Sequence, residues 1–406
     1  MSLIKIGEVF NFQGGTQPPK NEWKSEPMPG YVRMLQIRDF TQGKDKHIEF
    51  VKDDKKLNKC KADDILIGRY GASVGKILTG LEGAYNVAII KTIPDESKIH
   101  KRYLYYFLLN PRFQNFIRNI GGRAAQQGFN KEDISDYKLF LPPLPDQLHI
   151  ANLLSKAENL IAQRKESIRL LDEFLKSTFL EMFGDPVRNE KGWEKDKVIS
   201  YTDCIVPGRD KPKSFTGNIP WFTTEDLNQK GYVTKSKKEL GLSAEEIKEV
   251  RARVIPAGSV LMTCVGDLGV ISVCKEDCIV NQQLHAFISK EEINNLFLMY
   301  SLSFQTNFMY KKATSTTVPY MNKTTCNSIP VIVPPIGLQT KFAQIVEKTE
   351  ALKTQYQQSL QELENLYGSL SQKAFRGELS LKYDSLLSSV EHSRNMAAEP
   401  VVNYTK

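Results

Sequence analysis

Three short segments in the first half of the chain combine glycines with basic and amide side chains. Gly14-Gly15-Thr16 stands near Lys20, Arg69-Tyr70 stands near Lys76, and a third segment runs from Gly121 to Lys131. Backbone amides of glycine-rich loops and Lys or Arg side chains contact phosphates, whereas Arg, Gln and Asn read base edges. The candidate DNA-binding residues of this half are Gly14, Gly15, Thr16, Lys20, Arg69, Tyr70, Lys76, Arg123, Gln126, Gln127, Asn130 and Lys131.

The second half offers counterparts to these segments, namely Arg209, Lys211, Lys213, Thr316, Asn322 and Lys323. The strongest candidates in the two halves are Arg123, Gln126 and Lys323. Asn130 and Asn322 have an alternative role as helix N-caps, because Asn130 stands directly before a Lys-Glu-Asp sequence. Each of the others is also compatible with a solvated surface side chain.

The sequence shows no catalytic constellation. Gly71–Ile77 is one residue short of a phosphate-binding loop and lacks its magnesium-binding hydroxyl, which favours a turn between strands. The segments around Pro142-Pro143 and Pro334-Pro335 lack the polar and aromatic flanks with which amino-methyltransferases grip a flipped base. The histidines are scattered, and none of the six cysteines forms a C-x-x-C pair. We therefore expect buried, reduced thiols, no catalytic residue, no metal and no cofactor.

The composition is typical of a soluble protein with two or three domains. Of 406 residues, 41% are hydrophobic and 25% charged, and the formal net charge is +8. This mild basic excess is compatible with DNA binding without proving it. No run approaches the roughly 18 apolar residues of a membrane helix, and no secretory signal is visible. We expect a cytoplasmic protein without membrane contact.

The second half of the chain repeats the first, at an offset of about 192 to 195 residues for all but the first of the matched segments. Several matches in one order indicate an internal duplication rather than two unrelated α/β domains. The matched pairs are Gly30–Phe40 with Gly217–Leu227, Ala62–Ile67 with Ala257–Met262, Gly71 with Gly266, Asn86 with Asn281, Asn130-Lys131 with Asn322-Lys323, Leu141–Pro143 with Val333–Pro335, and Gln147 with Gln339.

Each half has the pattern of a mixed α/β domain. Helical spacing over Arg102–Phe116 and Ile293–Tyr310 predicts amphipathic helices that face a core. Each half ends in a strand, Tyr137–Leu141 or Ile329–Val333, before a Pro-Pro pair that stops sheet pairing. Short apolar runs between Gly, Asp and Asn predict further strands, including those at 65–67, 87–90, 260–262 and 270–273.

A long helix is expected after each Pro-Pro pair, because apolar residues there alternate spacings of four and three. A helix of about 36 residues spans roughly 55 Å and is stable only when its apolar stripe is buried. The predicted stripe of the second helix is Leu338, Phe342, Ile345, Thr349, Leu352, Tyr356, Ser359, Leu363, Leu366 and Leu370. That of the first helix is Ile150, Leu153, Ala157, Leu160, Arg164, Leu171 and Phe174.

We expect the two helices to pair antiparallel within one chain; pairing between two chains is the alternative. The predicted fold class is α+β, with two similar mixed α/β domains separated by two long helices that form an antiparallel coiled coil. The predicted divisions are 1–143 and 184–335 for the domains, 144–183 and 336–380 for the helices, and 381–406 for a polar tail.

Four segments resemble the specificity subunits of type I restriction-modification systems. Gln13–Lys20 resembles the family's Gly-Thr-Pro loop, and Leu141–Gln147 its strand exit into a conserved helix. Phe183–Pro186 resembles the junction into the second domain, and Lys373–Leu379 the end of the second helix. These segments cover almost the whole chain to about residue 380 in the family's order. Val206–Lys213 departs from the pattern, because it lacks the double glycine and the threonine.

The resemblance implies two target-recognition domains that bind two short half-sites of double-stranded DNA, at a spacing fixed by the helix pair. It also implies two methyltransferase subunits that dock on the helices and methylate adenine, and it leaves open whether a restriction subunit joins them. The chain itself is then a non-catalytic specificity subunit. The alternatives are a stand-alone DNA methyltransferase or nuclease, and a coiled-coil interaction protein with no nucleic-acid role.

Overall fold

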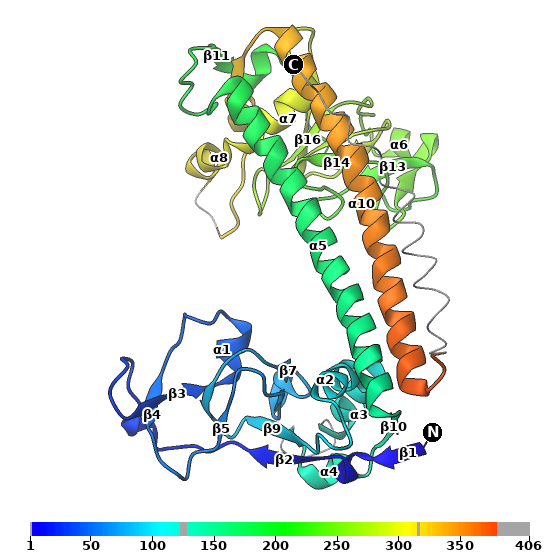
Figure 1. Ribbon diagram of the computed structural model, residues 1–406. Helices are drawn as coiled ribbons and strands as arrows, with labels where there is room; N and C mark the ends of the chain where they lie inside the picture. Colours follow the sequence, from blue (N-terminus) through cyan, green and yellow to red (C-terminus); the bar gives the residue numbers. More distant parts are fainter. Residues whose placement is uncertain (1, 122–127, 209, 315–316, 380–406) are drawn as a thin grey trace, which may run out of the picture. The chain divides into compact units, whose positions relative to one another are not determined.

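The computed structural model describes residues 2–121, 128–208, 210–314 and 317–379 (Figure 1). The chain divides into two compact units, which we call unit 1 (Met1–Gln163 with Leu360–Lys406) and unit 2 (Arg164–Ser359). Each unit contains an α/β domain and parts of two long helices, α5 (Leu144–Phe183) and α10 (Ile336–Arg376). The domain divisions expected from the sequence stay a prediction.

The domain of unit 1 contains two four-stranded sheets, one antiparallel throughout and one mixed, and a two-stranded ribbon. The first sheet has the order β2 (Phe10–Gly14), β9 (Ile89–Pro94), β6 (Leu66–Gly68), β7 (Ile77–Leu78). The second has the order β4 (Phe50–Lys52), β3 (Tyr31–Leu35), β8 (Gly83–Tyr85), β5 (Lys59–Cys60). The ribbon pairs β1 (Ser2–Lys5) with β10 (Lys138–Leu141), directly before α5.

The domain of unit 2 repeats this topology, which confirms the duplication predicted from the sequence. Its first sheet has the order β12 (Thr202–Ile205), β19 (Leu284–Ser289), β16 (Val260–Thr263), β17 (Ile271–Cys274), and adds a parallel strand, β14 (Gly231–Val233). The second has the order β15 (Gly241–Leu242), β13 (Ile219–Phe222), β18 (Ile279–Val280). The ribbon pairs β11 (Glu194–Lys197) with β20 (Pro330–Val333).

Two helices predicted as single runs are each divided in the structure. Arg102–Phe116 forms α2 (Lys101–Leu109) and α3 (Pro111–Gly121), because Pro111 has no N–H to continue α2 and instead begins α3. Ile293–Tyr310 forms α7 (Asn295–Ser303) and α8 (Thr306–Lys312). The strand predicted at 87–90 begins at Ile89, because the side chain of Asn86 accepts a hydrogen bond from Ala88 N and shapes a turn.

Both long helices are continuous, with 40 residues in α5 and 41 in α10, as the sequence predicted. Each ends before a glycine in the left-handed conformation, Gly184 (φ 73°) or Gly377 (φ 74°), a common helix stop. Within unit 2 the helices run antiparallel. The guanidinium of Arg164 lies 4.3 Å from the Tyr356 ring, and nearer the end of α5 the Phe179 ring lies 5.4 Å from that of Phe342. The helices therefore pair within one chain.

The predicted apolar stripes hold at positions such as Ile150 and Phe342, which are buried, and were wrong at a few others, which have an apolar neighbour in the chain. In α5, Leu154 and Leu175 are buried, whereas Leu160 and Phe174 are 50% and 51% exposed. In α10, Leu366 is 50% exposed. Apolar residues stand next to each other at these points, so two stripes with the same four-three spacing are available. Spacing alone does not choose between them.

Candidate nucleic-acid interface

The glycine loop of unit 1 packs backbone to backbone against the turn that follows β8. Gly15 N donates to Ile89 O at 3.0 Å and Thr16 N to Tyr85 O at 3.0 Å. A Cβ added at Gly15 would lie 1.9 Å from Asn86 O, so this position requires glycine. Nothing lies within 4 Å of a Cβ added at Gly14. Of the two glycines, Gly15 is therefore required by the fold, whereas Gly14 is not.

A groove of about 610 Å³ opens beside this loop; we call it the unit 1 groove. Residues that line it include Gly15, Thr16, Gln17, Lys52, Lys56 and Val87. Thr16 and Gln17 offer polar atoms, the two lysines offer positive charge, and Val87 is 40% exposed. This mixture can contact phosphates and base edges in the same place. Of the predicted residues, the groove brings Gly15 and Thr16 together.

Unit 2 has a groove of about 470 Å³ at the equivalent position, called the unit 2 groove. Its lining includes Lys211, Phe215, Trp221, Asn281 and Gln283. The equivalence follows from the sheets, because the strand before each loop pairs with the strand that follows the Asn86 or Asn281 turn. The sequence analysis used Asn281 only to align the repeat. An Asn-Gln-Gln run directly after an apolar strand was the available signal for a polar groove.

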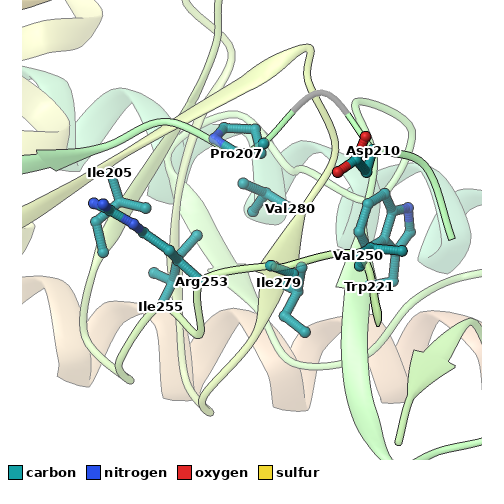
Figure 2. A pocket seen from close by; sticks show the side chains of 11 residues that line it. Ile205, Pro207, Asp210, Trp221, Val250, Arg253, Ile255, Ile279 and Val280 are labelled. Atoms are coloured by element: carbon teal, nitrogen blue, oxygen red, sulfur yellow. The ribbon is translucent and has the colours of Figure 1, made fainter. Parts of the chain in front are cut away.

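A smaller pocket adjoins the unit 2 groove (Figure 2). Figure 2 shows Arg253 and Ile205 at one end of this pocket and Asp210 and Trp221 at the other. Asp210 and Trp221 line both hollows. Apart from Asp210 and Arg253 the residues that line the pocket carry no charge, and the exposed Arg253 supplies the positive one.

A second predicted group, Arg69, Tyr70 and Asn130, comes together at the end of β6. Arg69 Nε donates to Phe129 O at 2.9 Å, and its Nη2 donates to the side chain of Asn130. The Arg69 guanidinium also lies 5.1 Å from the Tyr70 ring. Arg69 is thus bound within unit 1, where it anchors the segment before Lys131 to the sheet.

Both predicted asparagines occupy N-cap positions, as the alternative interpretation held. Asn130 precedes α4 (Lys131–Ser135), and its N–H donates to Asp133 Oδ2 at 2.6 Å. Asn322 precedes α9 (Lys323–Asn327), and its side chain accepts from Thr325 N at 2.9 Å. Their role in the local fold is thereby established, and DNA contact stays a prediction.

The remaining candidates are scattered over both units. Lys20 forms an ion pair of 2.8 Å with Glu49 and lies 3.6 Å from the Trp23 ring, and Lys213 lies 3.8 Å from Glu249. Exposed positions are occupied by Lys76, Lys131 and Lys323. Outside the described residues lie Arg123, Gln126, Gln127, Arg209 and Thr316.

All six cysteines are buried, as expected from the sequence, and burial raises the pKa of the Cys60 thiol to about 11. Among the residues that the structure describes, no three His, Cys, Asp or Glu side chains are placed to hold a metal ion. No helix in the same part of the chain is both long and apolar enough to cross a membrane.

Duplicated α/β domains, each with a groove beside its first loop and a share of two long helices, define a two-module recognition protein. A family model, the type I restriction modification DNA specificity domain, matches residues 1–170 and 207–365. The chain belongs to this family. The resemblance drawn from the sequence is therefore confirmed.

Relatives of the same type match most of the chain. The type I restriction enzyme MjaVIII specificity subunit of Methanocaldococcus jannaschii is 23% identical, over 94% of this chain and 93% of the relative. The EcoBI specificity subunit of Escherichia coli is also 23% identical, over 79% and 74%. The crystal structure of an S subunit from M. genitalium shares the fold, with a TM-score of 0.58 at 15% identity, over 92% of this chain and 96% of that chain.

Proposed function

We propose that the chain is the DNA specificity subunit of a type I restriction-modification complex, in which each unit reads one half of a bipartite site. The observation that carries this proposal is the pair of grooves at equivalent positions of two duplicated domains. Their linings differ, with Thr16 and Val87 in one groove and Trp221 and Gln283 in the other. Different side chains at the same place would select different bases.

We further propose that two methyltransferase subunits dock on the long helices and carry out the methylation, so that this chain needs no catalytic residue of its own. Large apolar side chains on the outer faces of the helices support this role, since exposed apolar surface marks protein interfaces. They are Leu160, Leu170 and Phe174 on α5, and Leu352 and Leu366 on α10. The proposal places this complex in the cytoplasm, and it does not depend on a restriction subunit.

The test is co-expression of the chain with a methyltransferase subunit in a host free of adenine methylation, followed by sequencing of methylated adenines. The expected result is a motif of two short half-sites separated by unspecified bases. Methylation by the partner alone, or at one continuous motif, would contradict the proposal. Methylation by the purified chain alone would instead favour a stand-alone methyltransferase.

A further inference from the structure

A cationic segment that the sequence analysis did not select lies beside each groove. In unit 1 it is residues 52–56, and we call it cationic segment 1. The side chains of Lys52, Lys55 and Lys56 are exposed and form no hydrogen bond or ion pair with any residue that the structure describes. In unit 2 it is residues 248–253, cationic segment 2. The exposed side chains of Arg251 and Arg253 likewise have no such partner among the described residues.

The two segments occupy equivalent positions in the duplicated fold. Cys60 pairs antiparallel with Gly83, and Ile255 pairs antiparallel with Cys278. Each cationic segment therefore leads into the same edge of the second sheet. In unit 1, Lys52 and Lys56 line the unit 1 groove. In unit 2, Arg253 lines the pocket that adjoins the unit 2 groove (Figure 2).

The residue two positions before each bridge shows how the two units differ. Asn58 in unit 1 is bound internally: its Oδ1 accepts from Gln13 Nε2 at 2.9 Å, and its Nδ2 donates to Gly14 O at 2.8 Å. Arg253 takes the same place in unit 2, in the pocket that Pro207 and Gly208 also line, and remains exposed. The amide of unit 1 serves the fold, whereas the guanidinium of unit 2 is available to a ligand.

Nearby acids do not neutralise either segment. In segment 1, Asp53 forms an ion pair with Lys59, so two acids that line the unit 1 groove, Glu22 and Asp54, are left against the three lysines. In segment 2, Glu249 lies 3.8 Å from Lys213, which leaves Asp210 as the acid that lines the adjoining pocket. Both segments therefore keep an excess of unpaired positive charge, which suits a polyanion.

The backbone of segment 2 makes Arg251 a suitable position for a test substitution. Arg251 has φ 48°, in the left-handed region that costs an L residue about 1 kcal/mol and favours glycine. The exposed guanidinium forms no hydrogen bond or ion pair with a described residue that would offset this cost. Replacement of Arg251 by glycine therefore removes the positive charge without straining the turn.

We propose that cationic segments 1 and 2 bind the phosphate backbone of double-stranded DNA along one edge of each groove. The inference rests on the proposed function and adds the place where the duplex is held. Lysines and arginines bind phosphates and thereby set the position of the protein on the duplex. The side chains in the grooves select bases. The two segments act as phosphate contacts that do not change the sequence read.

The experiment uses the full chain assembled with its methyltransferase partner and a duplex that carries the methylated motif. Binding constants are measured between about 50 and 200 mM salt. The variants are Arg251→Gly with Arg253→Gln, and separately Lys52→Gln with Lys55→Gln and Lys56→Gln. The matched controls are Lys138→Gln in unit 1 and Lys197→Gln in unit 2, which remove exposed lysines from the strand ribbons.

Each set of substitutions is expected to weaken binding by roughly three- to tenfold per lost phosphate contact at about 0.1 M salt, and to lower the slope of log K against log salt by about one per contact. The methylated motif stays unchanged, and Arg251→Gly does not lower the melting temperature, because glycine fits the turn better. The controls bind as the unsubstituted chain does.

Unchanged affinity and slope in both sets, with a normally methylating complex, would overturn this inference and leave the proposed function intact. A relaxed base preference at one half-site would also overturn it, because the segment would then read bases. Failure of the unsubstituted complex to bind or methylate a bipartite site would instead count against the proposed function.

Discussion

At the scale of single residues, one glutamine near the start of each long helix binds that helix to the preceding domain, and the hydrogen bonds follow the same pattern in both. The Gln147 side chain donates to Lys98 O and Pro142 O, each at 2.8 Å, and accepts from His100 N at 2.7 Å. Gln339 repeats this arrangement 192 residues later, and both side chains are fully buried. Each amide satisfies three backbone groups that would otherwise be unpaired.

Replacement of Gln147 by leucine is therefore expected to lower the free energy of unfolding of unit 1 by about 3 kcal/mol. The loss arises because buried carbonyl and N–H groups lose their partners while the volume of the side chain is kept. Gln339→Leu should do the same to unit 2. Urea denaturation of the full chain measures both. Gln355→Leu, at an exposed site of α10, is the control and should change stability by less than about 0.5 kcal/mol.

A buried histidine predicts a pH dependence in unit 2. Burial lowers the pKa of His285 to about 4, and the charge of Lys323 acts in the same direction. The unfolded chain binds a proton on this imidazole below about pH 6.5, whereas the folded chain does so only near pH 4. The stability from neutral His285 is thus present above pH 6.5 and is lost as the pH falls toward 4.

The expected loss is up to about 1.4 kcal/mol per pH unit over this window. It is measured by urea denaturation of unit 2 between pH 7 and 4, and His285→Leu should flatten the curve. His47→Gln, at an exposed position, should leave the curve unchanged. A curve that keeps its full slope in His285→Leu would show that another group titrates there.

The sequence identified only part of the candidate interface, for a physical reason. It selected the glycine loop, whose backbone approach requires Gly15, and the asparagines that cap helices. It also selected Arg69, which the fold uses internally, and it passed over Arg253, which the fold leaves exposed. Residue type shows what a side chain can bind; only the tertiary structure shows whether a backbone group already occupies it.

At the scale of elements, the ends of the long helices are held by aromatic clusters. The ring of Phe183, at the end of α5, lies 4.7 Å from that of Phe297 in α7. Phe375, near the end of α10, lies 5.2 Å from Tyr103 in α2. Each domain therefore contacts the start of the helix that follows it and the end of the other helix. The sequence predicted both helices and their stop signals, but not these contacts, because they join distant segments.

Two neighbouring residues of α5 test which stripe faces the core. Leu175 is fully buried and Phe174 is 51% exposed. Leu175→Ala should lower the free energy of unfolding of unit 2 by about 3 kcal/mol, because it leaves a cavity, whereas Phe174→Ala should cost less than about 1 kcal/mol. Thermal or urea unfolding distinguishes them. If the stripe predicted from spacing alone were correct, Phe174→Ala would be more destabilising than Leu175→Ala.

At the scale of the whole molecule, the long helices are expected to determine the number of unread bases between the half-sites. One extra heptad in each helix, after Gln163 in α5 and after Ser359 in α10, keeps the four-three spacing and lengthens both by roughly 10 Å. The methylated motif should then gain about three base pairs of spacer, at about 3.4 Å per pair, with both half-sites unchanged. Sequencing of methylated adenines measures this; an unaltered spacer would contradict the role.

Unit 2 is one continuous stretch of chain, whereas unit 1 needs residues 360–376 to cover its core. During translation, unit 2 can complete its fold while the first domain still lacks Tyr367, Leu370 and Phe375. During synthesis, the apolar surface of unit 1 that packs against the end of α10 therefore stays exposed. It is covered only when residues 360–376 have been made. Slow translation of the codons after residue 359 would therefore leave unit 1, rather than unit 2, accessible to chaperones and proteases.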